Sequence, residues 1–289
     1  MTTVANEMVA TDTSVDQLER QAQRRLRRRR IVIHALRMTL LVATLGSWEL
    51  SGRTGLTDPF FYSTPSAIVN QLWVWVREGT SQGPLWRQVL VTLEETGLGF
   101  LIGSVLGVIG GIALGRNRML ADIFSVYIKV ANSVPRVVLG SVFIMALGLG
   151  IASKVALAVV MVFFVVFGNA FQGVREADRN LIANAHILGA SSRQVTFSVV
   201  LPSAMTWILA SLHVSFGFAL VGAVVGEFLG ARQGIGLLIA TAQGTFNSAG
   251  VFAAMIVLGI VALIADFAIT RLENVLLKWR PAQFTDTGY

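Results

Sequence analysis

The sequence predicts an all-α membrane protein with six transmembrane helices. Hydrophobic residues make up 54% of the 289 residues and charged residues only 13%, about half the charged fraction of a soluble domain. A hydrocarbon core of roughly 30 Å needs about 20 apolar residues per helix, and several stretches reach that length. Because these stretches are long and continuous, they predict a helical bundle and not an outer-membrane barrel, whose strands are short and alternating.

The basic residues predict the orientation of the bundle. The net charge is +7, and six arginines between Arg24 and Arg30 precede the first apolar stretch. We interpret residues 1–30 as a cytoplasmic basic tail, irregular over residues 1–23 because no periodicity is visible there. Six crossings then place both termini in the cytoplasm. In this orientation 16 of the 23 Lys and Arg lie in or beside cytoplasmic segments, as the positive-inside rule requires for a multi-pass protein of the cell inner membrane.

Six stretches are apolar enough to cross the membrane. They divide the chain into the tail at 1–30, a first transmembrane helix with an outer interfacial helix at 31–84, a core at 85–280 and a cytoplasmic tail at 281–289. The predicted crossings are 31–50, 89–114, 123–147, 155–171, 199–225 and 251–272.

The polar segment after the first crossing predicts a short amphipathic helix. Thr64 suits an N-cap and Pro65 the first helical position, and apolar residues then recur at helical spacing up to Val76. Tryptophans favour the headgroup layer, so this helix is expected to lie on the outer membrane surface. The tryptophans concerned are Trp73, Trp75 and Trp86.

Glycines recur every four residues in the second crossing, from Gly99 to Gly115. A face of small residues lets another helix approach closely, so we expect a packing surface, with a pore lining as the alternative.

A proline interrupts the third crossing. Pro135 removes a helical hydrogen bond and predicts a kink or a break. Asn132, Ser133 and Arg136 flank it. Two interpretations stay open. These polar groups line a transport path, as polar groups beside a broken helix often do, or they have a local role and cap a helix end or snorkel to the interface.

No catalytic or metal-binding constellation is visible. The chain has no cysteine, its histidines are only His34, His186 and His213, and none has a metal-ligand spacing. No phosphate-binding glycine loop occurs. We therefore expect no cofactor, no metal and no enzymatic activity in this chain.

Two polar residues of the fifth crossing each have two interpretations. His213 is expected to be a buried packing residue or a group on a transport path. Glu227 ends this crossing and Arg232 follows five residues later, so Glu227 is either part of an interfacial ion pair or a helix-end charge, or a polar element of an outer gate.

The loop at residues 173–202 has the pattern helix, glycine, helix, and the predicted topology makes it cytoplasmic. Asp178 suits an N-cap, Gly189 a left-handed stop, and Ser191 a second N-cap. Apolar residues of the first helix share one face, which predicts a docking surface for a cytoplasmic partner. They are Leu181, Ile182, Ala185 and Leu188.

From Gly189-Ala190-Ser191 to Val199-Val200-Leu201-Pro202 the loop resembles that of bacterial ABC importer permeases. In that family the loop has the form EAA, three residues, G, nine residues, I-x-L-P, and it docks on the ATPase. The spacing from Gly189 to Pro202 matches in full. The acidic position falls on Ala183 and the next on Asn184, so Ala185 alone keeps the first element. Further segments are similar to the subfamily that imports nitrate, sulfonates or taurine. These are Ser63-Thr64-Pro65-Ser66, Gly148 to Lys154, Gly226-Glu227-Phe228-Leu229-Gly230, Gly234-Ile235-Gly236 and Lys278-Trp279-Arg280-Pro281.

The resemblance implies a type I ABC importer fold with residues 173–202 as the coupling loop of the permease core. It implies a second permease copy, most simply a homodimer, two separate ATPase subunits, an extracytoplasmic solute-binding protein and membrane lipid as partners, with no nucleic acid. The implied solute is small and anionic, such as a sulfonate, taurine or nitrate. The alternative is a channel or secondary transporter without an ATPase, which intramembrane ionisable pairs or an inverted repeat would favour and which the sequence does not show clearly.

Overall fold

The computed structural model describes residues 2–276, with the backbone alone for residues 2–25, 118, 179 and 272–276. The predicted tail at 281–289 and the Lys278 to Pro281 motif lie outside the described residues. The chain divides into two compact units, Met1–Ala67 and Ile68–Tyr289. Each is described separately.

The first unit contains one long helix, α1 (Thr2–Arg53), followed by the short α2 (Pro59–Tyr62). The expectation of an irregular chain at 1–23 was wrong, because α1 begins at Thr2. The physical reason is composition, since no Gly or Pro occurs before Gly46 and many of the residues are good helix formers. The part of α1 from Leu26 to Arg53 is long and apolar enough to cross a membrane.

A carboxylate fixes the end of α1 to the start of α3 (Pro65–Arg77). Glu49 accepts hydrogen bonds from the Ser66 backbone N–H at 3.0 Å and from the Ser66 hydroxyl at 2.8 Å. It also accepts one from Arg53 at 2.7 Å. These hydrogen bonds therefore join the two helix ends on either side of the polar connection at 54–64.

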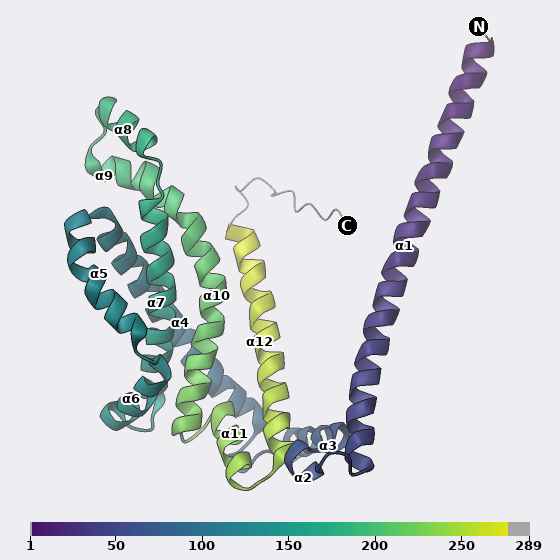
Figure 1. Cartoon of the computed structure of the whole chain (residues 1–289), viewed down its shortest axis with the longest axis vertical. Helices are drawn as coiled ribbons and strands as arrows, with labels where there is room; N and C mark the ends of the chain where they lie inside the picture. The colour runs from purple at the N-terminus through teal and green to yellow at the C-terminus, as the bar shows by residue number, and fades with distance from the viewer. Residues whose placement is uncertain (1, 277–289) are drawn as a thin grey trace. The chain divides into compact units, whose positions relative to one another are not determined.

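Three long helices form the centre of the second unit, α4 (Leu85–Arg116), α7 (Ile151–Arg175) and α10 (Leu201–Leu229). Helix α7 packs along both α4 and α10 (Figure 1). Its residues Leu157, Ala158, Val162 and Val166 are fully buried. Because α7 contacts the other two along its length, it is the axis of the bundle.

The glycine stripe of α4 is a packing surface, as predicted. A Cβ on Gly103 would lie 2.8 Å from the Val159 carbonyl oxygen and 2.8 Å from the Val162 Cβ. Gly107 and Gly111 face α7 equally closely. The stripe is filled by α7, so the alternative of a pore lining is excluded for this face.

The third crossing is broken, as Pro135 predicted. It consists of α5 (Arg118–Ser133), the short η1 (Arg136–Val138) and α6 (Leu139–Leu147), and its two halves are bent by 75°. Five helices of the described chain are long and apolar enough to cross a membrane, and the number of spans is six if this bent pair counts as one. The predicted count of six agrees with the structure.

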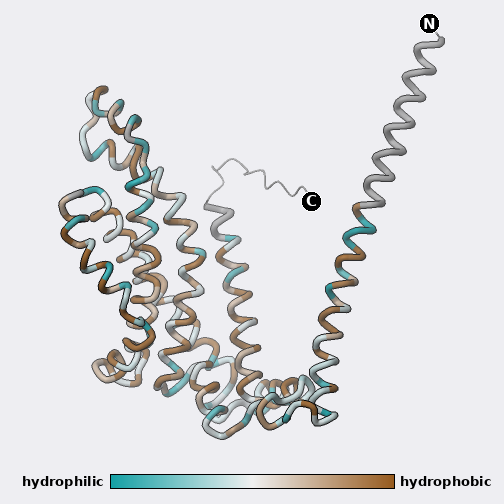
Figure 2. The backbone as a smooth tube through the Cα atoms, viewed as in Figure 1, coloured by the Kyte–Doolittle hydropathy of each residue, from teal (hydrophilic) through white to brown (hydrophobic). Residues whose placement is uncertain are grey.

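The remaining helices are the short α11 (Ile235–Gly244) and the long α12 (Ser248–Leu276), which pack on each other and on α10. Hydrophobic positions recur along the length of α12 (Figure 2), where lipid or a partner covers them. The predicted tryptophan layer is only partly right, because Trp73 and Trp86 are exposed whereas Trp75 is buried.

Candidate functional site

The loop between α7 and α10 folds into two short helices, α8 (Arg179–Ile187) and α9 (Ser192–Val195), which lie at one end of the bundle (Figure 1). The Asp178 carboxylate caps α8 by accepting from the Asn180 N–H at 2.8 Å. Gly189 has φ +83°, the left-handed conformation that ends α8. Ser191 and Gln194 form a capping box at the start of α9. The predicted pattern of helix, glycine and helix is confirmed.

The apolar face of α8 is only partly free. Leu181, Ile187 and Leu188 are exposed by 53%, 82% and 86%. Ile182 and Ala185 instead pack on the core cluster between α7 and α10. The expectation that the whole stripe faces no intramolecular core was therefore wrong, and the free surface is narrower than the sequence indicated. Other exposed residues of the loop are Ala183, Asn184 and Gly189, with Ala190 half-buried.

The loop runs into α10 through an under-wound segment. Residues Thr196–Val200, η2, form a π-helical turn, and Leu201 and Pro202 open α10 directly after it. Pro202 has no N–H to donate, so the regular helical ladder cannot pass through this point. The docking loop thus continues into a transmembrane helix without an intervening flexible link.

A buried polar cluster lies at the opposite end of α10 (Figure 1). Glu227 is 0% exposed. One carboxylate oxygen accepts from the Thr92 hydroxyl of α4 at 2.6 Å, and the other accepts from the Gly236 N–H of α11 at 2.7 Å. The expected interfacial ion pair with Arg232 was wrong, because the carboxylate points into the bundle and holds three helices together.

Two further contacts fasten the start of α11 to α4. The Gly234 N–H donates to the Gln88 side-chain oxygen at 2.8 Å, and the Ile235 N–H donates to the Thr92 hydroxyl at 3.0 Å. Helix N–H groups at this end lack intrahelical acceptors. Their acceptors come from α4 and α10, and the Glu227 charge also opposes the positive end of the α11 dipole.

Two more ionisable residues complete the cluster, Glu95 inside the second predicted crossing and Lys154 directly before the fourth. Glu95 of α4 is 2% exposed and Lys154 of α7 is 1% exposed. Glu95, Glu227 and Lys154 interact electrostatically with one another. The Lys154 ammonium group donates to the carbonyl oxygens of Leu149 at 2.8 Å and Gly150 at 3.2 Å. The sequence did not clearly indicate an intramembrane ionisable pair. The contacts among Glu95, Lys154 and Glu227 correct this prediction.

His213 lies near the middle of α10 and pairs with Asp266 of α12, with 3.1 Å between Nε2 and Oδ1. The side chain of His213 is 35% exposed and that of Asp266 is 63% exposed. Both line a cavity of about 590 Å³ between α10 and α12. His213 is therefore only half-buried, although it has the polar partner that the packing interpretation expected.

The polar residues at the break in the third crossing contact one another. The Arg136 guanidinium donates to the Asn132 side-chain oxygen at 2.5 Å and lies 4.8 Å from the centre of the Phe164 ring. The Ser133 hydroxyl donates to the Lys129 carbonyl oxygen at 2.9 Å. Pro135, Asn132 and Ser133 are exposed. They do not join the Glu227 cluster or the His213 pair.

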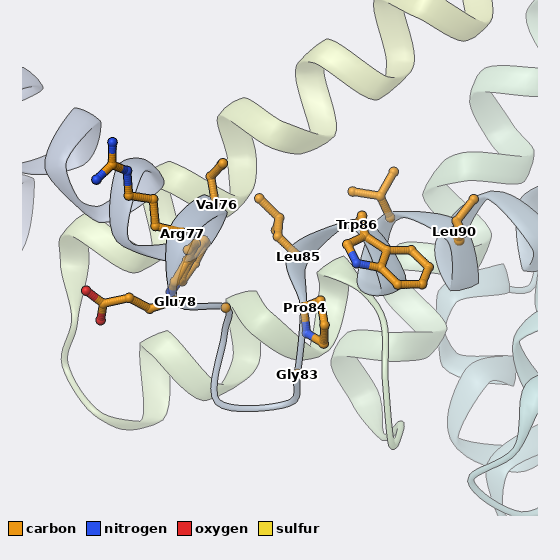
Figure 3. A pocket seen from close by; sticks show the side chains of 11 residues that line it. Val76, Arg77, Glu78, Gly83, Pro84, Leu85, Trp86 and Leu90 are labelled. Atoms are coloured by element: carbon orange, nitrogen blue, oxygen red, sulfur yellow. The ribbon is translucent and has the colours of Figure 1, made fainter.

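A second hollow separates α3 from the start of α4 (Figure 3). Its volume is about 730 Å³, and its walls are mainly apolar, with Trp75, Pro84 and Trp86 among them. The Arg77 and Glu78 side chains point away from Leu85 and Trp86 (Figure 3). Arg77 and Glu78 are the charged residues of its lining, and the other walls are mainly apolar, so its chemistry suits apolar chains better than a polar solute.

Comparisons with known proteins agree on one family. Residues 99–278 match the family described as binding-protein-dependent transport system inner membrane component, and the chain belongs to this family. It is 30% identical to the putative aliphatic sulfonates transport permease protein SsuC of Bacillus subtilis, over 84% of this chain and 87% of the relative.

Other relatives carry other substrates in their names. The chain is 28% identical to the formylaminopyrimidine transport permease protein ThiX of Halalkalibacterium halodurans, over 82% of this chain and 92% of that protein. It is 26% identical to the taurine transport system permease protein TauC of Escherichia coli, over 84% and 90%. Among solved structures, the inward-facing MetNI methionine ABC transporter has a TM-score of 0.59 at 20% identity, over 66% of this chain and 95% of that one. The predicted type I importer fold is confirmed, and the chain is a multi-pass permease subunit of the inner membrane.

Proposed function

We propose that two copies of this chain form the membrane path of an importer that two ATPase subunits drive and an extracytoplasmic binding protein supplies. The observation that carries the proposal is the α8–α9 loop. It presents Leu181, Ile187 and Leu188 to solvent beyond the bundle, although exposed apolar side chains of this size are a liability on a cytoplasmic surface. An ATPase groove that covers them explains their exposure, and the family membership supports an ATPase as the partner.

The coupling residues are proposed from the same loop. Asp178 and Ser191 fix the two short helices, Gly189 sets the angle between them, and Leu181 and Leu188 contact the ATPase. Ala183 lies where the family pattern is acidic and Asn184 lies at the next position, and both are exposed, so this chain docks there without an acidic side chain. Leu201 and Pro202 then carry the movement of the loop into α10 through η2.

Glu227 is proposed as part of an outer gate. It links the end of α10 to α4 and to the start of α11, so it positions α11 whenever α10 moves. His213, with Asp266, and the group at Asn132, Ser133, Pro135 and Arg136 are proposed to border the path. Their exposure in one chain fits surfaces that water or a second copy covers, because lipid would not tolerate them.

The proposed solute is a small anionic organic compound such as a sulfonate or taurine, with nitrate as an inorganic candidate. The relatives named for aliphatic sulfonates and taurine support this class. The relative named for formylaminopyrimidine shows that similar chains serve other small molecules. The binding protein encoded beside this chain therefore decides the solute to test first.

The test is reconstitution of the permease with the neighbouring ATPase and binding protein in lipid vesicles. Native mass spectrometry of the detergent-purified complex is expected to give two permeases with two ATPases. Uptake of ethanesulfonate, taurine or nitrate is expected to need both ATP and the binding protein. A stable permease monomer that transports without an ATPase would contradict the proposal.

The buried ionisable cluster favours one alternative, a secondary transporter that uses a proton or ion gradient. In that case uptake would continue without ATP and would stop when an ionophore collapses the gradient. In the proposed importer, ATP supports uptake in vesicles that hold no gradient.

A further inference from the structure

The hollow between the end of α3 and the start of α4 is held open by hydrogen bonds (Figure 3). The two helices are joined by a tight turn, in which the Thr80 N–H donates to the Gly83 carbonyl oxygen at 2.7 Å and the Gly83 N–H donates to the Thr80 carbonyl oxygen at 3.0 Å. The Gln88 side-chain amide then donates to the Gln82 carbonyl oxygen at 3.0 Å. The hollow therefore needs no ligand to form, and its volume of about 730 Å³ is within the range of about 300–1,000 Å³ that is typical of ligand sites.

The hollow lies at the level of the lipid headgroups. Helix α4 has 32 residues and is about 48 Å long at 1.5 Å per residue, which exceeds the hydrocarbon core of roughly 30 Å. Trp86 and Arg87 in its first turn are exposed, and these side chains anchor helix ends in the headgroup layer. Leu90, one turn further along, is 54% exposed and lines the same hollow. The apolar wall thus continues from the headgroup layer towards the hydrocarbon core, where lipid chains meet it.

Two opposite charges flank the apolar walls. The Arg77 guanidinium lies 4.2 Å from the centre of the Trp73 ring, and Glu78 follows directly. Both side chains are exposed and point away from Leu85 (Figure 3). Within the described residues, no hydrogen bond or salt bridge engages either charged group. A guanidinium group binds phosphate through charge-assisted hydrogen bonds, and a carboxylate accepts from an ammonium group. The two side chains are therefore complementary to a headgroup that carries both a phosphate and an ammonium group.

We infer that this hollow binds one phospholipid with the headgroup of phosphatidylethanolamine. One acyl chain lies between α3 and α4, the phosphate accepts from Arg77, and the ammonium group donates to Glu78. Phosphatidylcholine has no N–H to donate to Glu78, and phosphatidylglycerol has no cation to offset its charge. The inference uses the location of the chain in the membrane and does not depend on the proposed transport.

The experiment measures lipid binding by native mass spectrometry of the permease as purified from the membrane in detergent. It is titrated with phosphatidylethanolamine, phosphatidylcholine and phosphatidylglycerol that have the same acyl chains. We expect one phosphatidylethanolamine per permease copy to bind at least about 5-fold more tightly than either other lipid, because it alone gives both charged groups a partner.

Substitutions of exposed side chains test the two headgroup contacts. Arg77→Gln is expected to weaken the binding of all three lipids, whereas its control Arg87→Gln, exposed but outside the hollow, is not. Glu78→Gln is expected to lower the affinity for phosphatidylethanolamine to that for phosphatidylcholine. Its control is Glu94→Gln, which is also exposed and outside the hollow.

A further variant tests the place of the acyl chain. Leu85→Trp fills the hollow and is expected to abolish the tight binding, whereas Leu101→Trp, at a position of α4 that is 61% exposed and outside the hollow, is not. The exposed substitutions at Arg77 and Glu78 test the site even if Leu85→Trp does not accumulate in the membrane.

Four results would overturn the inference. Equal losses in Arg77→Gln and Arg87→Gln would show a general attraction of phospholipid to a basic surface. Equal affinities of the wild type for the three lipids would show that the headgroup is not recognised. Tight binding that persists in Leu85→Trp would place the lipid elsewhere. Binding only after partner subunits or a second copy are removed would show that protein covers the hollow. None of these measurements uses ATP or a solute, so the importer function is tested separately.

Discussion

At Gly189 the backbone has φ +83°, and no heavy atom lies within 4 Å of the place that a Cβ would take. A side chain there meets no neighbour, so its cost is the conformational strain of the left-handed region, roughly 1–2 kcal/mol. The strain is relieved if the angle between α8 and α9 changes. The consequence falls on the geometry of the loop and not on the packing of the bundle.

We therefore expect Gly189→Val to abolish solute uptake while the protein stays in the membrane at near-normal level. Gly189→Asn is expected to be milder, because asparagine tolerates the left-handed region better. The measurement is uptake in vesicles divided by permease abundance. Gly46→Val is the control, since Gly46 is helical and equally open. Wild-type uptake by the Gly189→Val variant would show that the loop does not couple ATP hydrolysis to transport.

A second prediction concerns the buried carboxylate of Glu227. Glu227→Ala leaves the Gly236 N–H without its acceptor and the Thr92 hydroxyl with only the Gln88 carbonyl oxygen at 3.2 Å, and a buried unpaired donor costs about 1–3 kcal/mol. Glu227→Gln keeps one side-chain oxygen and is expected to lose less. The midpoint of thermal unfolding in detergent is expected to fall in the order wild type, Gln, Ala. The control is Glu94→Ala, which replaces an exposed carboxylate one residue before Glu95. An unchanged unfolding midpoint for Glu227→Ala would contradict the stabilising role of the hydrogen bonds that join Glu227 to α4 and α11.

Among the elements, the contact of α4 with α7 is the most sensitive to small changes. Gly103→Ala places a methyl group against the Val159 carbonyl oxygen and the Val162 side chain. Overpacking of this kind costs about 1–3 kcal/mol. Gly97→Ala adds the same methyl group to the same helix where nothing lies within 4 Å. We expect a lower unfolding midpoint for Gly103→Ala alone, and equal midpoints would show that α4 shifts away from α7 at no cost.

Most helices and the break in the third crossing could be predicted from the sequence, because the residue patterns that indicate them are local. Hydropathy indicated the crossings, Pro135 indicated the break, and Asp178, Gly189 and Ser191 indicated the form of the docking loop. The start of α1 was missed for a reason of the same kind. No helix was predicted over residues 1–23, because this segment has no amphipathic periodicity. A segment without Gly or Pro can nevertheless be helical without an apolar face.

The buried cluster around Glu227 could not be predicted from local patterns. Thr92 and Glu227 are 135 residues apart in the chain, and nothing in the spacing of one helix indicates its partner on another. Lys154 and Glu227 both lie near the ends of crossings, where charged residues are ordinarily assigned to the interface. The one available signal was Glu95, a charged residue well inside the second crossing, which calls for a partner in the bundle.

For the whole molecule, the orientation is the prediction to check first. The chain has no cysteine, so single cysteines report on one place each. Glu78→Cys and Arg193→Cys both replace exposed residues. In intact cells an impermeant maleimide is expected to label the cysteine at position 78 and not the one at position 193. Both are expected to react after the cells are opened, and the reverse pattern would invert the topology.

Helix α10 has a mechanical consequence for the complete transporter. Its 29 residues span about 43 Å at 1.5 Å per residue, and no proline follows Pro202 to make it bend. It is a stiff rod that starts at the docking loop, rests against α7 along its length and ends at the Glu227 clamp. A rod that pivots near its middle moves its two ends in opposite directions, and a tilt of about 5° displaces each end by about 2 Å. In the proposed importer, a push on α8–α9 would therefore move α11 in the opposite direction, and one rigid movement of α10 would close one face of the membrane path while it opens the other.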